Sequence, residues 1–118
     1  MRYTKEEHRD KAIDTESFAA TLPSTPAGIE WAITAQFYAA LHYVSAYFAI
    51  SNQFHASHGT RLREIKKDPV LNAIYDDYQH LYNISRDARY ECMNLNLSNL
   101  TFAKGKLETI KKTVCPHL

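Results

Sequence analysis

The segment from Pro26 to Ser51 constrains the fold more than any other part of the chain. Between Ala27 and Ile50 its only formal charge is Glu30. A helix of this length could span a membrane, but the neighbouring segments are hydrophilic and too many polar groups lie along it: Gln36, Tyr38, His42, Tyr43, Ser45 and Tyr47. A helix that is apolar nearly all round is otherwise buried at the centre of a protein. We therefore predict no membrane span and a central helix covered by other helices.

The two faces of this predicted helix differ in side-chain size. One face carries bulky residues that we expect to fill the main core: Ile33, Phe37, Leu41, Val44 and Phe48. The opposite face carries small residues around His42: Ala35, Ala39, Ala46 and Ala49. Because the distance between two packed helices depends on the side chains between them, we expect a second helix to approach closely here. That helix belongs either to this chain or to a partner.

Capping residues predict where the first two helices begin. Thr4 and Glu7 have the spacing of a capping box, in which each side chain accepts a hydrogen bond from the other residue's backbone. They precede a predicted helix over residues 5–20. Thr25 precedes a proline at the first position of the central helix, an arrangement typical of helix starts.

Two helices are expected after the central one: a short helix over residues 60–67 and a longer one over residues 69–91. Asp68 precedes a proline and is the candidate cap of the longer helix. Its apolar residues recur at three- and four-residue steps, which is one face of an α-helix: Leu71, Ile74, Tyr75, Tyr78, Leu81, Tyr82 and Ser85. Continuing this count places Ala88 and Arg89 on the same stripe.

A last helix is expected to begin after Ser98, its candidate cap, and to end near Pro116. The only alternating run, residues 93–97, is too short and isolated to pair as a strand, so we interpret it as a connection. The sequence therefore predicts an all-α fold, an antiparallel up-and-down bundle of four main helices plus one short helix. With 118 residues we expect one domain over residues 1–118.

Composition excludes few function classes. The net charge of +1 argues against a broadly basic nucleic-acid-binding surface but allows a local basic patch. Cys92 and Cys115 form no paired motif, and the first seven residues contain no apolar signal segment. We therefore expect free thiols, a cytoplasmic protein and no cofactor. We also expect no metal site, because His55 and His58 lack the further ligands that a structural zinc ion requires.

Three stretches of the sequence resemble a known family. They are residues 31–43, which include Phe-Tyr-Ala-Ala-Leu-His, then the Ser-His-Gly-Thr-Arg run at 57–61, and residues 81–90 with two arginines. Together they resemble the HEPN domain, a small α-helical bundle of bacteria and archaea, and most of all its uncharacterised stand-alone bacterial members. The similarity covers roughly residues 29–91.

The resemblance implies a homodimer, which we expect to form through the central helix and the helix over residues 69–91. It also implies one of two kinds of function. Many HEPN proteins are RNA-cleaving toxins or effectors in stress and antiphage defence. Others are non-catalytic and bind RNA, a nucleotide or a protein partner, such as a nucleotidyltransferase, encoded nearby.

The nuclease motif of the family is absent from its expected place. The ribonuclease members carry an arginine and a histidine separated by four to six residues. From Arg86 that window contains residues 91–93, and from Arg89 it contains residues 94–96, none of which is histidine. Only Arg2 and His8 have the spacing, and they lie at the other end of the chain. We therefore expect no standard HEPN ribonuclease activity.

Two arginines are the leading candidates for a binding site. Arg89 falls within an apolar stripe, where an unpaired charge is costly. With Arg86 it would form an anion-binding cluster, because one guanidinium group can donate two parallel hydrogen bonds to two anionic oxygens. Tyr90 would add a hydroxyl or a stacking face. The alternative for each arginine is an ion pair with a carboxylate, and for Arg89 also an extended side chain that reaches water from the helix end.

Three further residues complete the candidate site. His58 and Arg61 would lie at the start of the short helix, whose backbone amides favour an anion. His42 would serve as a general base or an orienting donor; alternatively it is a buried histidine satisfied by one hydrogen bond. The ligand-binding candidates are therefore Arg86, Arg89, Tyr90, His58 and Arg61, and the catalytic candidates are His42 and Arg86.

The leading hypothesis for function is a non-catalytic HEPN-like module that binds RNA, a nucleotide or a protein partner in stress or defence. One alternative is a metal-independent endoribonuclease that uses a displaced histidine such as His42 or His58. The other is a structural dimerisation module whose arginines only hold two copies together.

Overall fold

The computed structural model describes residues 2–118, and they form an all-α fold, as predicted. No strand occurs in this range, and the chain contains five α-helices and two short 3₁₀ helices: α1 (Lys5–Ala20), α2 (Pro26–Ile50), α3 (His58–Lys67), η1 (Leu71–Ile74), α4 (Tyr75–Tyr90), α5 (Leu97–Val114) and η2 (Cys115–His117). The molecule measures 40 × 26 × 24 Å. None of the helices in the described range has the length and apolar character needed to cross a membrane.

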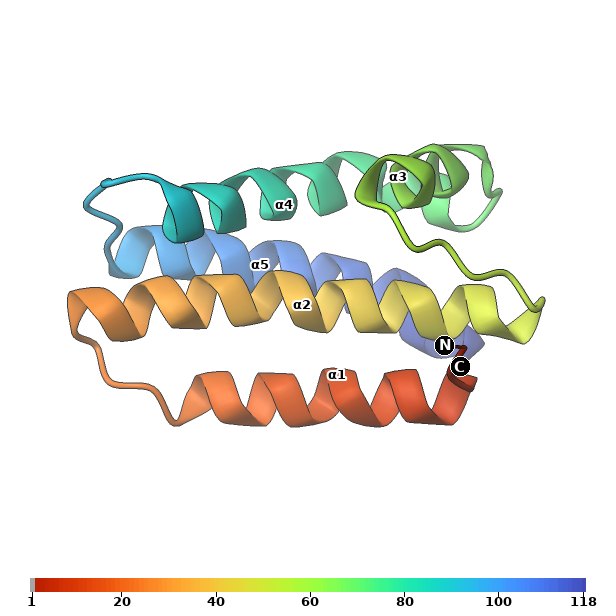
Figure 1. The fold of residues 1–118 in the computed structure, drawn as a ribbon, viewed down its shortest axis with the longest axis horizontal. Helices are drawn as coiled ribbons and strands as arrows, with labels where there is room; N and C mark the ends of the chain where they lie inside the picture. The colour runs from red at the N-terminus through yellow and green to blue at the C-terminus, as the bar shows by residue number, and fades with distance from the viewer. Residues whose placement is uncertain (1) are drawn as a thin grey trace.

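Helix α2 is the centre of the fold, as its composition predicts. It packs against α1, α4 and α5, and it lies between α1 and α4 with α5 behind it (Figure 1). Bulky residues such as Phe37 and Val44 are buried in the core, and Ala39 and Ala46 are fully buried as well. Helix α1 of the same chain is the second helix expected on the small-residue side, where His42 contacts it.

The first three helices begin at capped residues. The capping box of Thr4 and Glu7 is present, with both reciprocal hydrogen bonds made. The hydroxyl of Thr25 accepts a hydrogen bond from a backbone N–H in the first turn of α2. Helix α3 begins two residues earlier than predicted, because the hydroxyl of Ser57 accepts from the N–H of Thr60.

Two predicted helix starts differ from the structure. The Asp68 carboxylate accepts hydrogen bonds from the N–H groups of Val70 and Leu71, so it holds a tight turn and η1 ahead of α4 rather than the first turn of α4 itself. The prediction of Ser98 as the last cap is wrong. Asn96 caps α5 and makes a capping box with Asn99, because its side-chain carbonyl satisfies the N–H three residues on.

Polar contacts hold α1 against the rest of the molecule, since this helix buries only two alanines. The Glu16 carboxylate accepts a hydrogen bond from the hydroxyl of Tyr43 on α2 and lies 3.0 Å from the ammonium group of Lys111 on α5. Burial and this carboxylate raise the pKa of Tyr43. Glu16 therefore joins α1 to both α2 and α5.

The connection between α1 and α2 requires a glycine at its end. A Cβ atom at Gly28 would lie 1.9 Å from the backbone oxygen of Pro23, which is far inside van der Waals contact. A Cβ atom at Gly105, in the middle of α5, would meet no atom within 4 Å. Gly28 and Gly105 are therefore expected to respond to alanine in opposite ways.

We predict that Gly28→Ala lowers the free energy of unfolding by about 2 kcal/mol, because the backbone of the connection must move to accept the methyl group. Gly105→Ala should raise it by up to about 1 kcal/mol, because alanine loses less backbone entropy in a helix. Urea unfolding followed by circular dichroism measures both. A Gly28→Ala protein as stable as the Gly105→Ala protein would contradict the close approach of Pro23.

Candidate functional site

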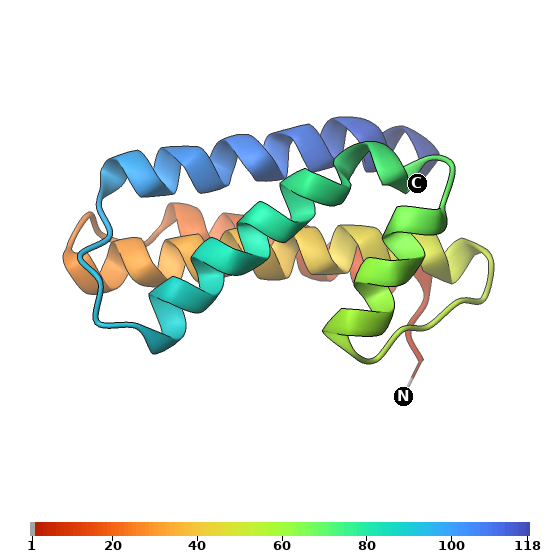
Figure 2. The same cartoon turned by 90° about the horizontal axis from the view of Figure 1, so that it is seen from above.

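Five of the predicted site residues line a single cleft between α2, α3 and α4: His58, Arg61, Arg86, Arg89 and Tyr90. The cleft has a volume of about 480 Å³, and its other lining residues are Phe37, Tyr38, Leu41 and Tyr82. We call it the arginine cleft. Residues far apart in the sequence meet here because α3 and α4 both cover the same side of α2 (Figure 2).

Arg89 is fixed by neutral groups. Its Nε donates to the backbone oxygen of Ser85 at 3.2 Å, and its Nη1 donates to the hydroxyl of Tyr38 at 3.0 Å. The guanidinium carbon also lies 5.6 Å from the ring centre of Tyr38 and 5.2 Å from that of Tyr90. These contacts orient the charge without cancelling it.

Arg86 is exposed, and its guanidinium carbon lies 5.7 Å from the ring centre of Tyr90. Within residues 2–118, no carboxylate oxygen lies within 4.0 Å of a nitrogen of Arg86 or Arg89. The alternative of structural ion pairs for these two residues is therefore wrong for the described part of the chain. Glu30 lines a neighbouring hollow with Arg89 but makes no ion pair with it.

Arg61 carries the most deeply buried charge of the cleft, with only 8% of the residue exposed. Its Nη2 donates to the backbone oxygen of His55 at 2.7 Å, and its side chain has no carboxylate partner among residues 2–118. Burying a charge that lacks an opposite charge is costly. A site that keeps such a charge is suited to an anionic ligand.

His58 forms the aromatic wall of the cleft. Its ring stacks on that of Tyr82, with centroids 3.5 Å apart and an angle of 11° between the planes. Burial lowers the pKa of His58, and the charges of Arg61, Arg86 and Arg89 lower it further, so the imidazole is neutral at pH 7. Its Nδ1 is buried without a hydrogen-bond partner in the described structure. Such unpaired buried groups are uncommon in folded proteins.

His42, a predicted catalytic candidate, does not line the arginine cleft. Its Nδ1 lies 3.1 Å from Nδ1 of His8, across the contact between α2 and α1. Successive residues of a helix point about 100° apart, so Leu41 faces the cleft while His42 faces α1. The grouping of His42 with the arginines is therefore wrong. His42 has one hydrogen-bond partner, as the alternative expected, but its side chain is only half-buried.

Tyr38 belongs to the site although the sequence did not single it out. Tyr82 also belongs to it; the sequence allowed Tyr82 a base-stacking role with Tyr75 and Tyr78 as the less favoured of two interpretations. Tyr38 orients Arg89, and Tyr82 supports His58. Tyr82 was expected to pack in the core because it lies on the apolar stripe of α4. The spacing of Tyr38 and Leu41, three residues apart on one face of α2, was a signal that both could border one cleft.

The cleft has the chemistry of an anion site with aromatic walls. Three guanidinium groups offer several N–H donors to anionic oxygens, and tyrosine and histidine rings offer faces on which a planar group can stack. In residues 2–118, no three His, Cys, Asp or Glu side chains are grouped so that they could hold a metal ion.

Comparisons with protein-family models, curated proteins and solved structures give no significant match.

The His8–His42 contact makes stability depend on pH. Burial, and to a smaller extent the charges of His8, Lys11 and Arg61, lowers the pKa of His42 to about 4. The unfolded chain therefore binds more protons than the folded one between pH 4 and 6.5, and stability rises with pH in that range.

We predict that His42→Gln loses less stability than the wild type when the pH falls from 6.5 to 4. Urea unfolding at several pH values measures the difference, and His80→Gln, on the exposed side of α4, is the matched control. Equal losses in wild type and His42→Gln would contradict a neutral His42.

Proposed function

We propose that the protein is a non-catalytic, HEPN-like module that binds the phosphate groups of single-stranded RNA or a nucleotide in the arginine cleft. The observation that carries this proposal is the convergence of Arg61, Arg86 and Arg89 on one cleft without a carboxylate among its lining residues. Phosphate oxygens accept hydrogen bonds from guanidinium groups in a favourable paired geometry.

The aromatic side chains favour a nucleic-acid ligand over a simple inorganic anion. Tyr38 and Tyr90 border the cleft beside Arg89, and Tyr90 is 67% exposed. Single-stranded nucleic acids bind to sites that combine positive charge with rings on which bases stack. The two halves of a nucleotide, phosphate and base, thus each have a counterpart in the cleft.

We also infer the assembly of the module. The connections of residues 21–25 and 91–96 are short, which favours antiparallel neighbours in an up-and-down bundle. Trp31, 62% exposed, and Tyr38 lie on α2 beside Tyr90 of α4. We propose that the face around Trp31, outside the arginine cleft, binds a second copy and brings two clefts close together.

The cellular setting is part of the same proposal. Cys92 and Cys115 are free thiols, as expected in a reducing compartment, so we place the protein in the cytoplasm. The HEPN resemblance favours a role in stress or defence, with a protein partner encoded nearby.

We predict that Arg86→Ala and Arg89→Ala each weaken binding of a fluorescein-labelled oligouridylate at least tenfold, because each removes a charge-assisted contact to phosphate. Each should also lower the slope of log affinity against log salt concentration by about 0.7, the value for one lost contact to a single strand. Fluorescence anisotropy between 50 and 200 mM salt measures both. Arg9→Ala, on α1 outside the cleft, is the matched control and should bind as the wild type does.

Binding that both arginine variants retain would contradict the cleft as the site. A wild type that binds no RNA but dimerises, and whose dimer is lost in Arg89→Ala, would instead establish the structural dimerisation module. Sedimentation velocity of the same variants distinguishes these outcomes.

One observation favours the alternative of an endoribonuclease. His58 lies within the cleft and its lowered pKa keeps the imidazole in the neutral form that a general base requires. His42, the other displaced histidine, lies outside the cleft. The catalytic alternative therefore rests on His58 with Arg86.

We predict that the purified protein does not cleave labelled single-stranded RNA in the presence of EDTA, because three positive charges beside His58 make it a weak base. Gel analysis of the products measures this. Cleavage that is lost in His58→Asn and Arg86→Ala but kept in His42→Gln would overturn the non-catalytic assignment. Cleavage that is kept in all three variants would indicate a contaminating nuclease.

A further inference from the structure

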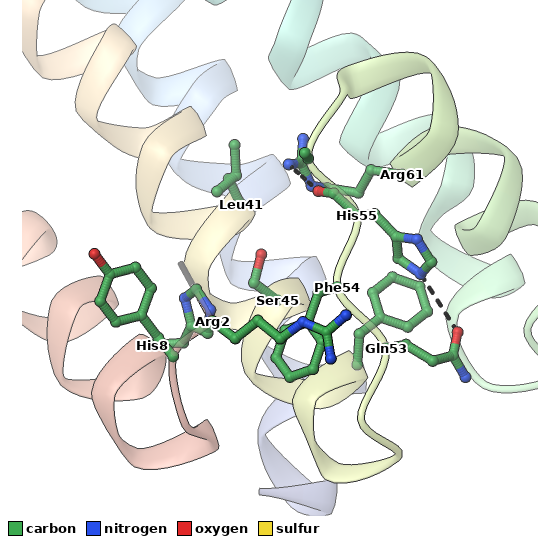
Figure 3. Close-up of a pocket in the computed structure, with 11 residues that line it drawn as sticks. Arg2, His8, Leu41, Ser45, Gln53, Phe54, His55 and Arg61 are labelled. Carbon is green, nitrogen blue, oxygen red and sulfur yellow. Dashed lines mark hydrogen bonds between the residues drawn. The ribbon is translucent and has the colours of Figure 1, made fainter.

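A second hollow lies on the other side of Arg61. It has a volume of about 390 Å³ and is lined by residues of α1, α2, α3 and the loop that follows α2 (Figure 3). We call it the N-terminal pocket, because Arg2, Tyr3 and His8 form one of its walls. Arg61 and Leu41 line both this pocket and the arginine cleft, so the two hollows adjoin.

The N-terminal pocket combines positive charge with aromatic rings, like the arginine cleft. The guanidinium carbon of Arg2 lies 4.8 Å from the ring centre of Phe54. No carboxylate of residues 2–118 lines the pocket, and its polar walls include Ser45 and Gln53. The pocket is therefore suited to a planar, polar group attached to an anion.

Arg61 links the two hollows through a fixed geometry. Its hydrogen bond to the backbone oxygen of His55 ties α3 to the loop that forms the pocket wall (Figure 3). The buried hydroxyl of Tyr78 also interacts with Arg61, so this side chain stands between the core and the two hollows. An anion bound to Arg61 would therefore lie at the border between the cleft and the pocket.

We propose that the N-terminal pocket binds the base of the nucleotide next to the one whose phosphate occupies the arginine cleft. The ligand is then a single strand of at least two nucleotides, not a free mononucleotide. This inference rests on the proposed function, because the cleft must bind the phosphate. The bound strand would then run from α4, past Arg61, to the α1 side of the molecule.

The test compares two small competitors for a labelled hexauridylate: uridine monophosphate and the dinucleotide UpU. The monophosphate carries more negative charge per phosphate, so it competes better if charge alone decides the affinity. If the pocket takes a second base, UpU competes roughly tenfold better, since stacking one base contributes about that factor.

A variant that fills the pocket sharpens the test. Ser45→Leu places a larger side chain in the pocket wall, and it should remove the advantage of UpU while leaving the monophosphate unchanged. Ser17→Leu, on the exposed side of α1, is the matched control. Phe54→Ala, which removes a pocket ring instead of filling the space, should have the same effect, and circular dichroism verifies that each variant is folded.

The outcomes separate this inference from the proposed function. Equal competition by UpU and monophosphate, with both weakened by Arg86→Ala, would overturn the pocket but keep the cleft. UpU binding that survives Arg86→Ala and Arg89→Ala but is lost in Ser45→Leu would overturn the continuous path. Absence of hexauridylate binding by the wild type would overturn both proposals.

Discussion

The burial of most of α2 is the constraint on which the rest of the structure depends. A segment with one formal charge between Ala27 and Ile50 must be covered, and α1, α4 and α5 provide that cover. The side of α2 that carries Tyr38 and Leu41 receives only the ends of α3 and α4, and there the cover is incomplete. The arginine cleft lies at this gap, so the packing of α2 creates the candidate site.

The cleft arginines differ from the lysines that join helices. Lys106 pairs with Asp77 at 3.2 Å, and Lys111 pairs with Glu16 at 3.0 Å, so cations that join helices have acidic partners. The cleft arginines instead bind backbone oxygens, hydroxyls and ring faces. In a chain whose net charge is +1, this local excess of positive charge is a feature of one cleft and not of the whole surface. The burial of Arg61 beside two further guanidinium groups, in a cleft that no carboxylate of residues 2–118 lines, is what points to a ligand.

The sequence predicted the helices better than the contacts between them. Local chemistry determines where a helix starts, so the caps at Thr4, Glu7 and Thr25 were predicted correctly. The prediction of Ser98 as a cap was wrong only because Asn96, two residues earlier, offers an equivalent acceptor. The convergence of Arg61 with Arg86 depends on how α3 packs beside α4, which no local pattern encodes. His42 was grouped with the arginines because an imidazole suits catalysis. The direction in which its side chain points, however, differs by one helical residue from that of Leu41, which does line the cleft. The partners of Arg89 were likewise beyond prediction, because Tyr38 is 51 residues away in the sequence.

The same charges that make the cleft a good phosphate site make His58 a poor catalyst. A general base is most effective when its pKa lies near the working pH, and burial, together with the charges of the three arginines, lowers the pKa of His58 below its ordinary value. A bound phosphate would offset those charges and raise the pKa of the imidazole again, so protonation of His58 and anion binding favour each other. A protonated His58 would then donate a hydrogen bond to the phosphate instead of accepting a proton from the ribose. In this cleft, histidine and arginines therefore act in the same direction, toward holding an anion.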